Sequence, residues 1–291
     1  MKLKLRHKEI LTAYTFLVPS LGLLSVFLLY PLVNVFWMSF HKWAIFGPPK
    51  WKGIDNYVWA FNEPNFLKAL EFTGYYTLTV TPMLFFLAFV TALICNANID
   101  GTTFFRSMFF LPVVMATATA SFIWLWLYNE FYGVLLMLIK WLGIITEENF
   151  NVWTTGDRAL WAVNIMVTWK FAGVQMIILI AGMQSIRDDL YEASTLMGAS
   201  RLQNIIYITT PLIKHSIALA LVMSIAGSIM AYEQFYIMSR GGPSNETRPL
   251  LMYIIDLGFK YTKLGRAAAI STVMVFIIFI VTLVQLKLFK R

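Results

Sequence analysis

Six apolar stretches dominate the sequence, and each is long enough for a helix to cross a lipid bilayer, which takes roughly 20 residues. Their approximate limits are Leu11–Phe40, Thr73–Cys95, Met108–Tyr128, Ala159–Met183, Pro211–Met238 and Ala267–Leu286. Of all residues 59% are hydrophobic and 13% are charged, against about a quarter charged in ordinary soluble domains. The sequence therefore predicts an all-α membrane protein with six transmembrane helices. It excludes a disordered chain, and it disfavours a water-soluble enzyme.

The distribution of Lys and Arg predicts the side of the membrane on which each loop lies. Four of the first eight residues are basic, and so are three of the last five. Because basic segments are retained in the cytoplasm and six spans return the chain to its starting side, we expect both termini to be cytoplasmic. Residues 1–10 then form a cytoplasmic segment, and residues 11–291 form a single transmembrane domain. Its predicted outer loops are 41–72, 129–158 and 239–266, and its largest inner loop is 184–211.

Motifs for catalysis and for nucleotide binding are absent from the sequence. No Gly-x-x-x-x-Gly-Lys-Ser/Thr segment occurs, so we expect this chain not to hold ATP phosphates itself. One cysteine and three histidines in separate flanking segments provide no set of metal ligands. We attribute the net charge of +8 to membrane topology rather than to nucleic-acid binding. The sequence thus predicts no enzymatic activity, no metal site and no cofactor bound by this chain.

The inner loop 184–211 has the pattern of a short amphipathic helix. Asp188 and Asp189 suit a helix N-terminus, because acidic side chains are stabilised near its exposed N–H groups. Apolar residues then recur on one face, at Leu190, Ala193 and Met197, and Gly198 can end the helix. Such an exposed apolar face needs a partner. The pattern leaves two possibilities open: a helix lying on the lipid surface, or a helix docked to a cytoplasmic protein.

The same loop resembles the EAA loop of binding-protein-dependent ABC importer permeases. The matching residues are Glu192-Ala193-Ser194, Gly198, Ile208 and Pro211. Ser194 replaces the second Ala of the family pattern, Thr210 replaces a Leu, and Met197 stands where an Asp often precedes the Gly. Two further segments resemble the sugar branch of that family, which includes the maltose and glycerol-3-phosphate permeases. They are Gly53-Ile54-Asp55-Asn56-Tyr57 and Ser239-Arg240-Gly241-Gly242-Pro243.

The resemblance implies a type I ABC importer permease in a bacterial or archaeal cell membrane. Its expected partners are a second, homologous permease in a heterodimer, two ATPase subunits that bind ATP and Mg²⁺, and an extracytoplasmic solute-binding protein. Its expected substrate is a carbohydrate, most simply a di- or oligosaccharide. The residues expected to couple to the ATPase are Asp189, Leu190, Tyr191, Glu192, Ala193, Ser194, Met197, Gly198 and Ala199. Those expected to face the binding protein are Gly241, Gly242 and Pro243.

The fourth and fifth apolar stretches contain the candidate substrate path. Lys170 lies near the middle of the fourth stretch, and an ionisable residue inside a membrane span is a functional-site hypothesis by default. A stripe of small and polar residues follows one face of the fifth stretch. The candidate path residues are Val167, Lys170, Phe171, Val174, Ser224, Ser228, Ala231 and Tyr232. Tight helix packing would explain the stripe equally well, and Lys170 could instead pair with Glu233 or with the second permease.

Three alternatives compete with a sugar importer. A permease for a polyol or a glycerol phosphate would share every motif described above. An ion-coupled secondary transporter would need no ATPase, but it should show internal repeats, and none is visible in the sequence. A membrane scaffold without substrate would not require Lys170 or the polar stripe.

Overall fold

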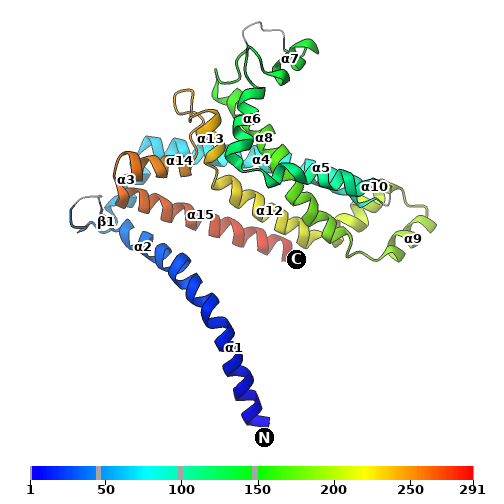
Figure 1. Ribbon diagram of the computed structural model, residues 1–291, viewed down its shortest axis with the longest axis horizontal. Helices are drawn as coiled ribbons and strands as arrows, with labels where there is room; N and C mark the ends of the chain where they lie inside the picture. Colours follow the sequence, from blue (N-terminus) through cyan, green and yellow to red (C-terminus); the bar gives the residue numbers. More distant parts are fainter. Residues whose placement is uncertain (1, 44–46, 98–100, 146–149, 291) are drawn as a thin grey trace. The chain divides into compact units, whose positions relative to one another are not determined.

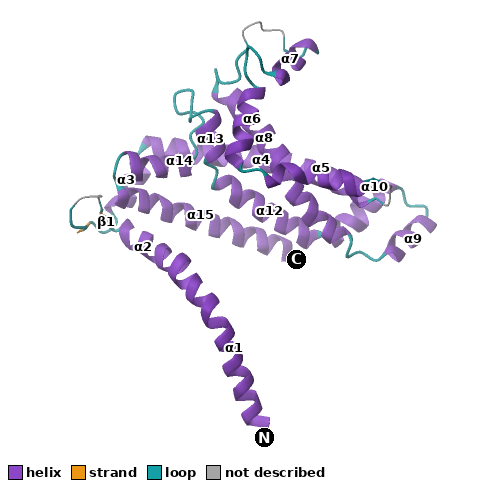
Figure 2. Cartoon of the chain, in the orientation of Figure 1, coloured by secondary structure: helices purple, strands orange, loops and turns teal. Residues whose placement is uncertain are grey.

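The computed structural model describes residues 2–43, 47–97, 101–145 and 150–290. Parts of the predicted outer loops 41–72 and 129–158 lie outside the described residues, as do residues 98–100 and Arg291 at the basic C-terminus. Helices account for most of the chain, and two short strands are described (Figure 2). The chain divides into two compact units, residues 1–63 with 254–275 and residues 64–253 with 276–291.

The first unit is built from helices and a small antiparallel hairpin. Its elements are α1 (Lys2–Leu24), the π-helical turn η1 (Ser25–Leu29), α2 (Tyr30–Ser39), β1 (His41–Lys42), β2 (Lys50–Trp51), α3 (Asp55–Asn62), the π-helical turn η3 (Asp256–Lys260) and the first part of α15 (Leu264–Lys290). In the hairpin His41 pairs with Trp51, and Lys42 pairs with Lys50. Asn56 Nδ2 donates to the carbonyls of Ser39 and His41, which ties α3 to the hairpin.

The segment Tyr14–Ser39 is a continuous apolar helix with exposed side chains along its length. Phe16 and Phe27, for example, are 79% and 75% exposed within the chain. Apolar side chains exposed along most of a helix of this length are stable only when lipid or protein covers them.

The second unit contains the bundle that positions the candidate site. Its elements are α4 (Pro64–Asn96), α5 (Thr102–Val114), α6 (Thr117–Leu127), α7 (Val134–Trp141), α8 (Gly156–Met183), α9 (Asp188–Leu196), α10 (Arg201–Asn204), η2 (Ile205–Thr209), α11 (Thr210–Leu212), α12 (Lys214–Ile229), α13 (Glu233–Met238), most of α14 (Leu250–Ile255) and the end of α15. The long helices α4 and α8 pack side by side, and α5 and α12 pack against them (Figure 1). The buried side chains on these faces are mainly aliphatic and aromatic.

Two of the six predicted spans are bent rather than continuous. The helices α5 and α6 meet at 99°, and the segment Arg201–Leu212 meets α12 at 74°. The other four spans are continuous helices, Tyr14–Ser39, Pro64–Asn96, Gly156–Met183 and Leu264–Phe289. The described residues therefore contain four to six candidate membrane spans, depending on whether each bent pair crosses as one span. The expectation of one helix over Pro211–Met238 is wrong, because α12 ends at Ile229 and α13 is separate.

Proline accounts for two of the three π-helical turns. Pro31 follows η1 by two residues, and Pro211 follows η2 by two residues. A proline within a helix has no N–H to donate, and its ring clashes with the carbonyl four residues earlier. Widening the preceding turn relieves that clash, since a π-helical turn accommodates one extra residue.

Candidate functional site

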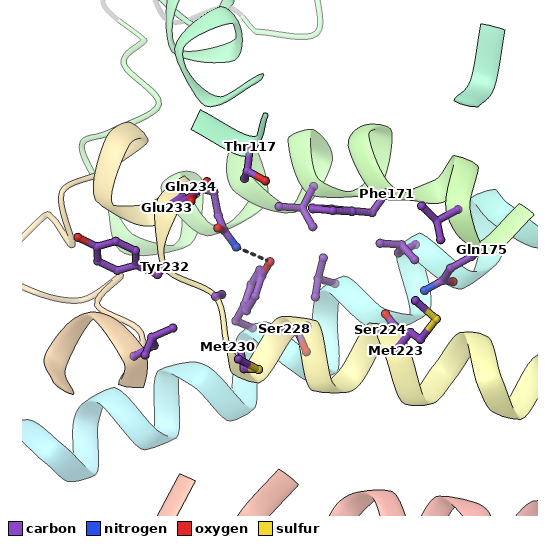
Figure 3. Close-up of a pocket in the computed structure, with 18 residues that line it drawn as sticks. Thr117, Phe171, Gln175, Met223, Ser224, Ser228, Met230, Tyr232, Glu233 and Gln234 are labelled. Atoms are coloured by element: carbon purple, nitrogen blue, oxygen red, sulfur yellow. Dashed lines mark hydrogen bonds between the residues drawn. The ribbon is translucent and has the colours of Figure 1, made fainter. Parts of the chain in front are cut away.

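A pocket of about 540 Å³ lies beside α12, with walls from α4, α8 and the segment that joins α12 to α13. Figure 3 shows its lining, with Phe171 and Gln175 coming from α8 and Ser224 and Ser228 from α12. Most of the wall is apolar, and a few polar side chains interrupt it. This composition is typical of small-molecule sites, in which few polar groups orient a ligand against apolar walls.

The structure brings seven of the eight candidate path residues together around this pocket. They are Val167, Phe171, Val174, Ser224, Ser228, Ala231 and Tyr232. The Tyr232 ring points away from the centre of the lining and stacks on Tyr236, with ring centroids 5.4 Å apart (Figure 3). An aromatic platform inside the pocket is therefore supplied by Phe171 rather than by Tyr232.

Two polar atoms in the pocket wall lack an intramolecular partner among the described residues. They are the Ser224 hydroxyl and the amide oxygen of Gln175, and both are buried. The Gln175 amide nitrogen donates to the Ala220 carbonyl, at 3.2 Å, which fixes the orientation of that side chain. Because a buried polar atom without a hydrogen bond costs free energy, both atoms require a partner beyond the described residues, such as an ordered water or a polar ligand that reaches them.

The far end of the pocket is also polar. Gln234 Nε2 donates to the Tyr76 hydroxyl at 3.4 Å, and the Glu233 carboxylate belongs to the same lining (Figure 3). Sequence reasoning did not select Tyr76 or Gln175 for the path. Gln175 could have been found from its position, since it lies four residues after Phe171 and so on the same face of α8.

Lys170 does not line the pocket. Its side chain is 2% exposed and donates to the carbonyls of Pro112, Val113 and Met115, with the shortest distance 2.5 Å to Met115. These carbonyls lie at the C-terminal end of α5, where the helix bends into α6 and leaves acceptors without intrahelical donors. In this structure Lys170 stabilises the bend, because a cation at a helix C-terminus satisfies carbonyls and interacts favourably with the helix dipole.

The helix α9 begins and ends where the sequence predicts. It starts at Asp188, with Asp188 and Asp189 in its first turn. After the helix, Gly198 has φ of 82°, its N–H donates to the Thr195 carbonyl, and the next N–H donates to the Ser194 carbonyl. This pair of bonds is a Schellman motif, in which glycine supplies the left-handed conformation.

The two faces of α9 differ in chemistry. Ser194 is 5% exposed, and the Tyr191 hydroxyl forms a hydrogen bond of 2.9 Å with the Thr209 hydroxyl in η2. These two side chains hold α9 against the rest of its unit. The opposite face is exposed, and it carries Asp189, Leu190, Glu192, Ala193, Leu196, Met197 and Gly198. Ala199, the last of the predicted coupling residues, is half-buried behind the glycine.

The Gly241-Gly242-Pro243 segment forms the base of a tight loop after α13. The Thr247 hydroxyl, which is buried, donates to the Gly242 carbonyl and to Ser239 Oγ. The exposed tip of the loop is Ser244-Asn245-Glu246, and the Glu246 carboxylate accepts from the Gly156 N–H at the start of α8. The glycines and proline predicted to face a partner therefore shape the loop, whereas the following three residues present its outer surface.

Proteins of similar sequence provide a comparison for the whole chain. No family model matched the sequence. The chain is 31% identical to the probable ABC transporter permease protein YurN of Bacillus subtilis, over 95% of each chain. It is 30% identical to the multiple sugar-binding transport system permease protein MsmF of Streptococcus mutans, over 96% of this chain and 95% of that protein. The chain belongs to the permease family of sugar ABC transporters.

Solved structures share the fold of this permease. A bacterial ABC transporter that imports the acidic polysaccharide alginate contains a chain that matches it with a TM-score of 0.83 and 22% identity, over 100% of this permease and 99% of that chain. In a second structure, the alginate transporter is in complex with a periplasmic protein bound to an alginate pentasaccharide, and the TM-score is 0.82 at 22% identity. That match covers 98% of this permease and 96% of the other chain. The permease is thus an integral membrane protein with the fold of an ABC importer permease.

Proposed function

We propose that this permease forms half of the translocation path of an ATP-driven importer for an uncharged di- or oligosaccharide. The observation that carries the proposal is the pocket beside α12, with Phe171 as an apolar platform and two unpartnered polar atoms on Gln175 and Ser224. A sugar ring presents apolar faces and many hydroxyl groups, so it matches both kinds of wall.

The charge of the pocket supports a neutral substrate. Among the described lining residues there is one ionisable acid, Glu233, and there is no Lys, Arg or His. An anionic ligand would be repelled by that carboxylate, and the cation behind the wall, Lys170, has its Nζ over the Phe171 ring, 4.9 Å from its centroid, and donates to carbonyls of the α5–α6 bend. This argues against a glycerol phosphate, the alternative that the sequence motifs leave open, and a neutral polyol remains the second candidate on the same grounds.

The proposed importer contains three further kinds of subunit: an ATPase, a second permease and a binding protein. The exposed face of α9 is proposed to dock in a groove of a cytoplasmic ATPase subunit, which holds ATP and Mg²⁺, and this permease itself hydrolyses nothing. A second permease completes the path, and an extracytoplasmic binding protein delivers the sugar near the loop tip Ser244-Asn245-Glu246. In this topology both termini are cytoplasmic, in a bacterial or archaeal cell membrane, as the basic N-terminal residues favour.

The test is reconstitution of the permease with its co-purifying subunits in lipid vesicles. We expect a panel of neutral sugars, presented with the cognate binding protein, to stimulate ATP hydrolysis and uptake. The variant Glu233→Gln should raise the relative uptake of uronate-containing sugars about two- to fivefold, because it removes one repulsive charge. A preparation that contains no ATPase subunit would contradict the importer. Uptake that needs only an ion gradient would favour the secondary transporter instead.

A further inference from the structure

A second cleft, in the first unit, is lined by four basic side chains and two tryptophans. Its volume is about 520 Å³, and the residues that define it are Lys42, Lys52, Lys263, Arg266, Trp43 and Trp59. We call it the basic cleft. It lies where the segment Tyr14–Ser39 has just ended and where α15 begins, and both of these helices are candidate membrane spans. The basic cleft is therefore at the end of two spans, where a bilayer meets water.

The charges in the basic cleft are not balanced within the described residues. Asp55 is the one acidic side chain in its lining, and it forms an ion pair of 3.8 Å with Lys52. Lys42 lies directly opposite Lys50 in the hairpin, and like charges at such positions repel. The Arg266 guanidinium stacks over the Trp59 ring at 4.2 Å, which orients the cation without neutralising it. An anion in the cleft would relieve this repulsion.

The backbone around the basic cleft is fixed by specific contacts. The Gly265 N–H donates to the Trp43 carbonyl at 3.2 Å, which joins the first turn of α15 to the hairpin. A side chain at Gly265 would overlap the His41 carbonyl, so the helix and the hairpin approach as closely as glycine allows. The cations are thus carried by a preorganised frame, which lowers the entropy cost of binding an anion.

The geometry points to the basic cleft as a binding site for a phosphate-bearing anion, either the headgroup of an anionic phospholipid or free phosphate. Lys and Arg are the side chains that bind phosphate oxygens, and the basic cleft gathers four of them. Apolar side chains flank the cleft, with Trp51 and Tyr261 exposed beside it, and Trp and Tyr are enriched at the level of the headgroups. Acyl chains would find the exposed apolar faces of α2 directly below.

The experiment compares phosphatidylglycerol with phosphatidylcholine on the full-length permease, purified with the subunits that remain bound to it. The protein is placed in nanodiscs that contain equal amounts of the two lipids, and the lipids it retains are counted by native mass spectrometry. We expect phosphatidylglycerol to be retained preferentially. The double variant Lys42→Gln/Lys263→Gln should reduce that preference by about fivefold for each lysine.

The control is the double variant Lys68→Gln/Lys287→Gln, which removes the same charge from exposed positions outside the cleft. It should keep the preference. Size-exclusion profiles should be unchanged in both variants, since all four lysines are exposed and removing them creates no cavity. If Lys42→Gln/Lys263→Gln nevertheless misfolds, the single variant Lys42→Gln on the hairpin serves instead.

A second arm separates the two sources of phosphate. If inorganic phosphate displaces phosphatidylglycerol and binds in pure phosphatidylcholine nanodiscs, the natural ligand is free phosphate; if it does neither while phosphatidylglycerol is retained, the ligand is a lipid headgroup. Equal retention of both lipids without phosphate binding would overturn the proposal. So would equal losses in the two double variants, or cross-links from Lys42 and Lys263 only to acidic residues of another subunit.

Discussion

The helix α9 and the pocket beside α12 arrange polar and apolar groups in opposite ways. In α9 the polar side chains of Tyr191 and Ser194 face inward, and apolar side chains such as Met197 are exposed. In the pocket most of the wall is apolar, and Gln175 Oε1 and Ser224 Oγ are buried without a partner among the described residues. Each region leaves unsatisfied the kind of group that its proposed ligand would satisfy: apolar surface for a protein, and hydrogen-bonding atoms for a hydroxylated solute.

The largest expected effect comes from Lys170, which lies on the pocket helix but faces the α5–α6 bend. The variant Lys170→Met leaves three carbonyls without this donor, in one buried and two partly buried hydrogen bonds, and an unsatisfied buried acceptor costs about 1–3 kcal/mol. We expect a clear fall in the thermal unfolding temperature of the purified protein, whereas Lys287→Met at an exposed position should leave it unchanged. If Lys170→Met kept its full stability and lost sugar binding, Lys170 would instead contact the substrate.

Gly198 tests whether the end of α9 must keep its geometry. Its φ of 82° is unfavourable for any residue with a branched side chain, so Gly198→Val should displace the helix end and reduce uptake about tenfold at normal membrane insertion. The control Gly143→Val has a similar φ of 71° and equally open surroundings. Vesicle uptake assays on both variants separate backbone strain in general from strain at α9, and equal losses would contradict a special role for α9.

Glu192 tests the exposed face of α9 without altering its anchors. We expect Glu192→Lys to lower uptake severalfold and to weaken co-purification of the ATPase subunits, because it reverses the charge on a docking face. Glu71→Lys, a charge reversal at an exposed position in α4, should leave co-purification of the ATPase subunits unchanged. Normal co-purification and uptake with Glu192→Lys would mean that α9 rests on lipid.

The smallest expected effect concerns the pocket. Ser224→Ala removes one buried hydroxyl that has no hydrogen-bond partner among the described residues, so the protein without ligand should lose little stability. A sugar that donates to this hydroxyl would lose one hydrogen bond, and KM for uptake should rise about two- to threefold. Ser107→Ala, whose hydroxyl bonds the Thr103 carbonyl on an exposed helix face, is the matched control. An unchanged KM for Ser224→Ala would place the sugar elsewhere.

Local sequence patterns predicted the helix α9 and seven residues of the pocket lining. Helix periodicity placed Val167, Phe171 and Val174 on one face, and the glycine rule located the end of α9. The two bends and the direction of Lys170 were not predictable in this way. The partners of Lys170 lie 55 to 58 residues earlier in the chain, and no local pattern records such a contact. The direction of the Tyr232 ring was also not predictable, because Tyr232 lies in the break between α12 and α13 and not on a continuous helix face.

The π-helical turn η2 links the position of α9 to the direction of α12. It holds one more residue than an α-helical turn, it contains Thr209, to which α9 is bonded, and it precedes the 74° bend into α12. If η2 changed from a π-helical turn to an α-helical turn, the backbone after it would rotate by about 100°, which is the rotation per residue in an α-helix. Because Arg201–Leu212 and α12 meet at an angle of 74°, a rotation of the helix before the bend would displace the far end of α12. A displacement of α9 would in this way change the shape of the pocket beside α12.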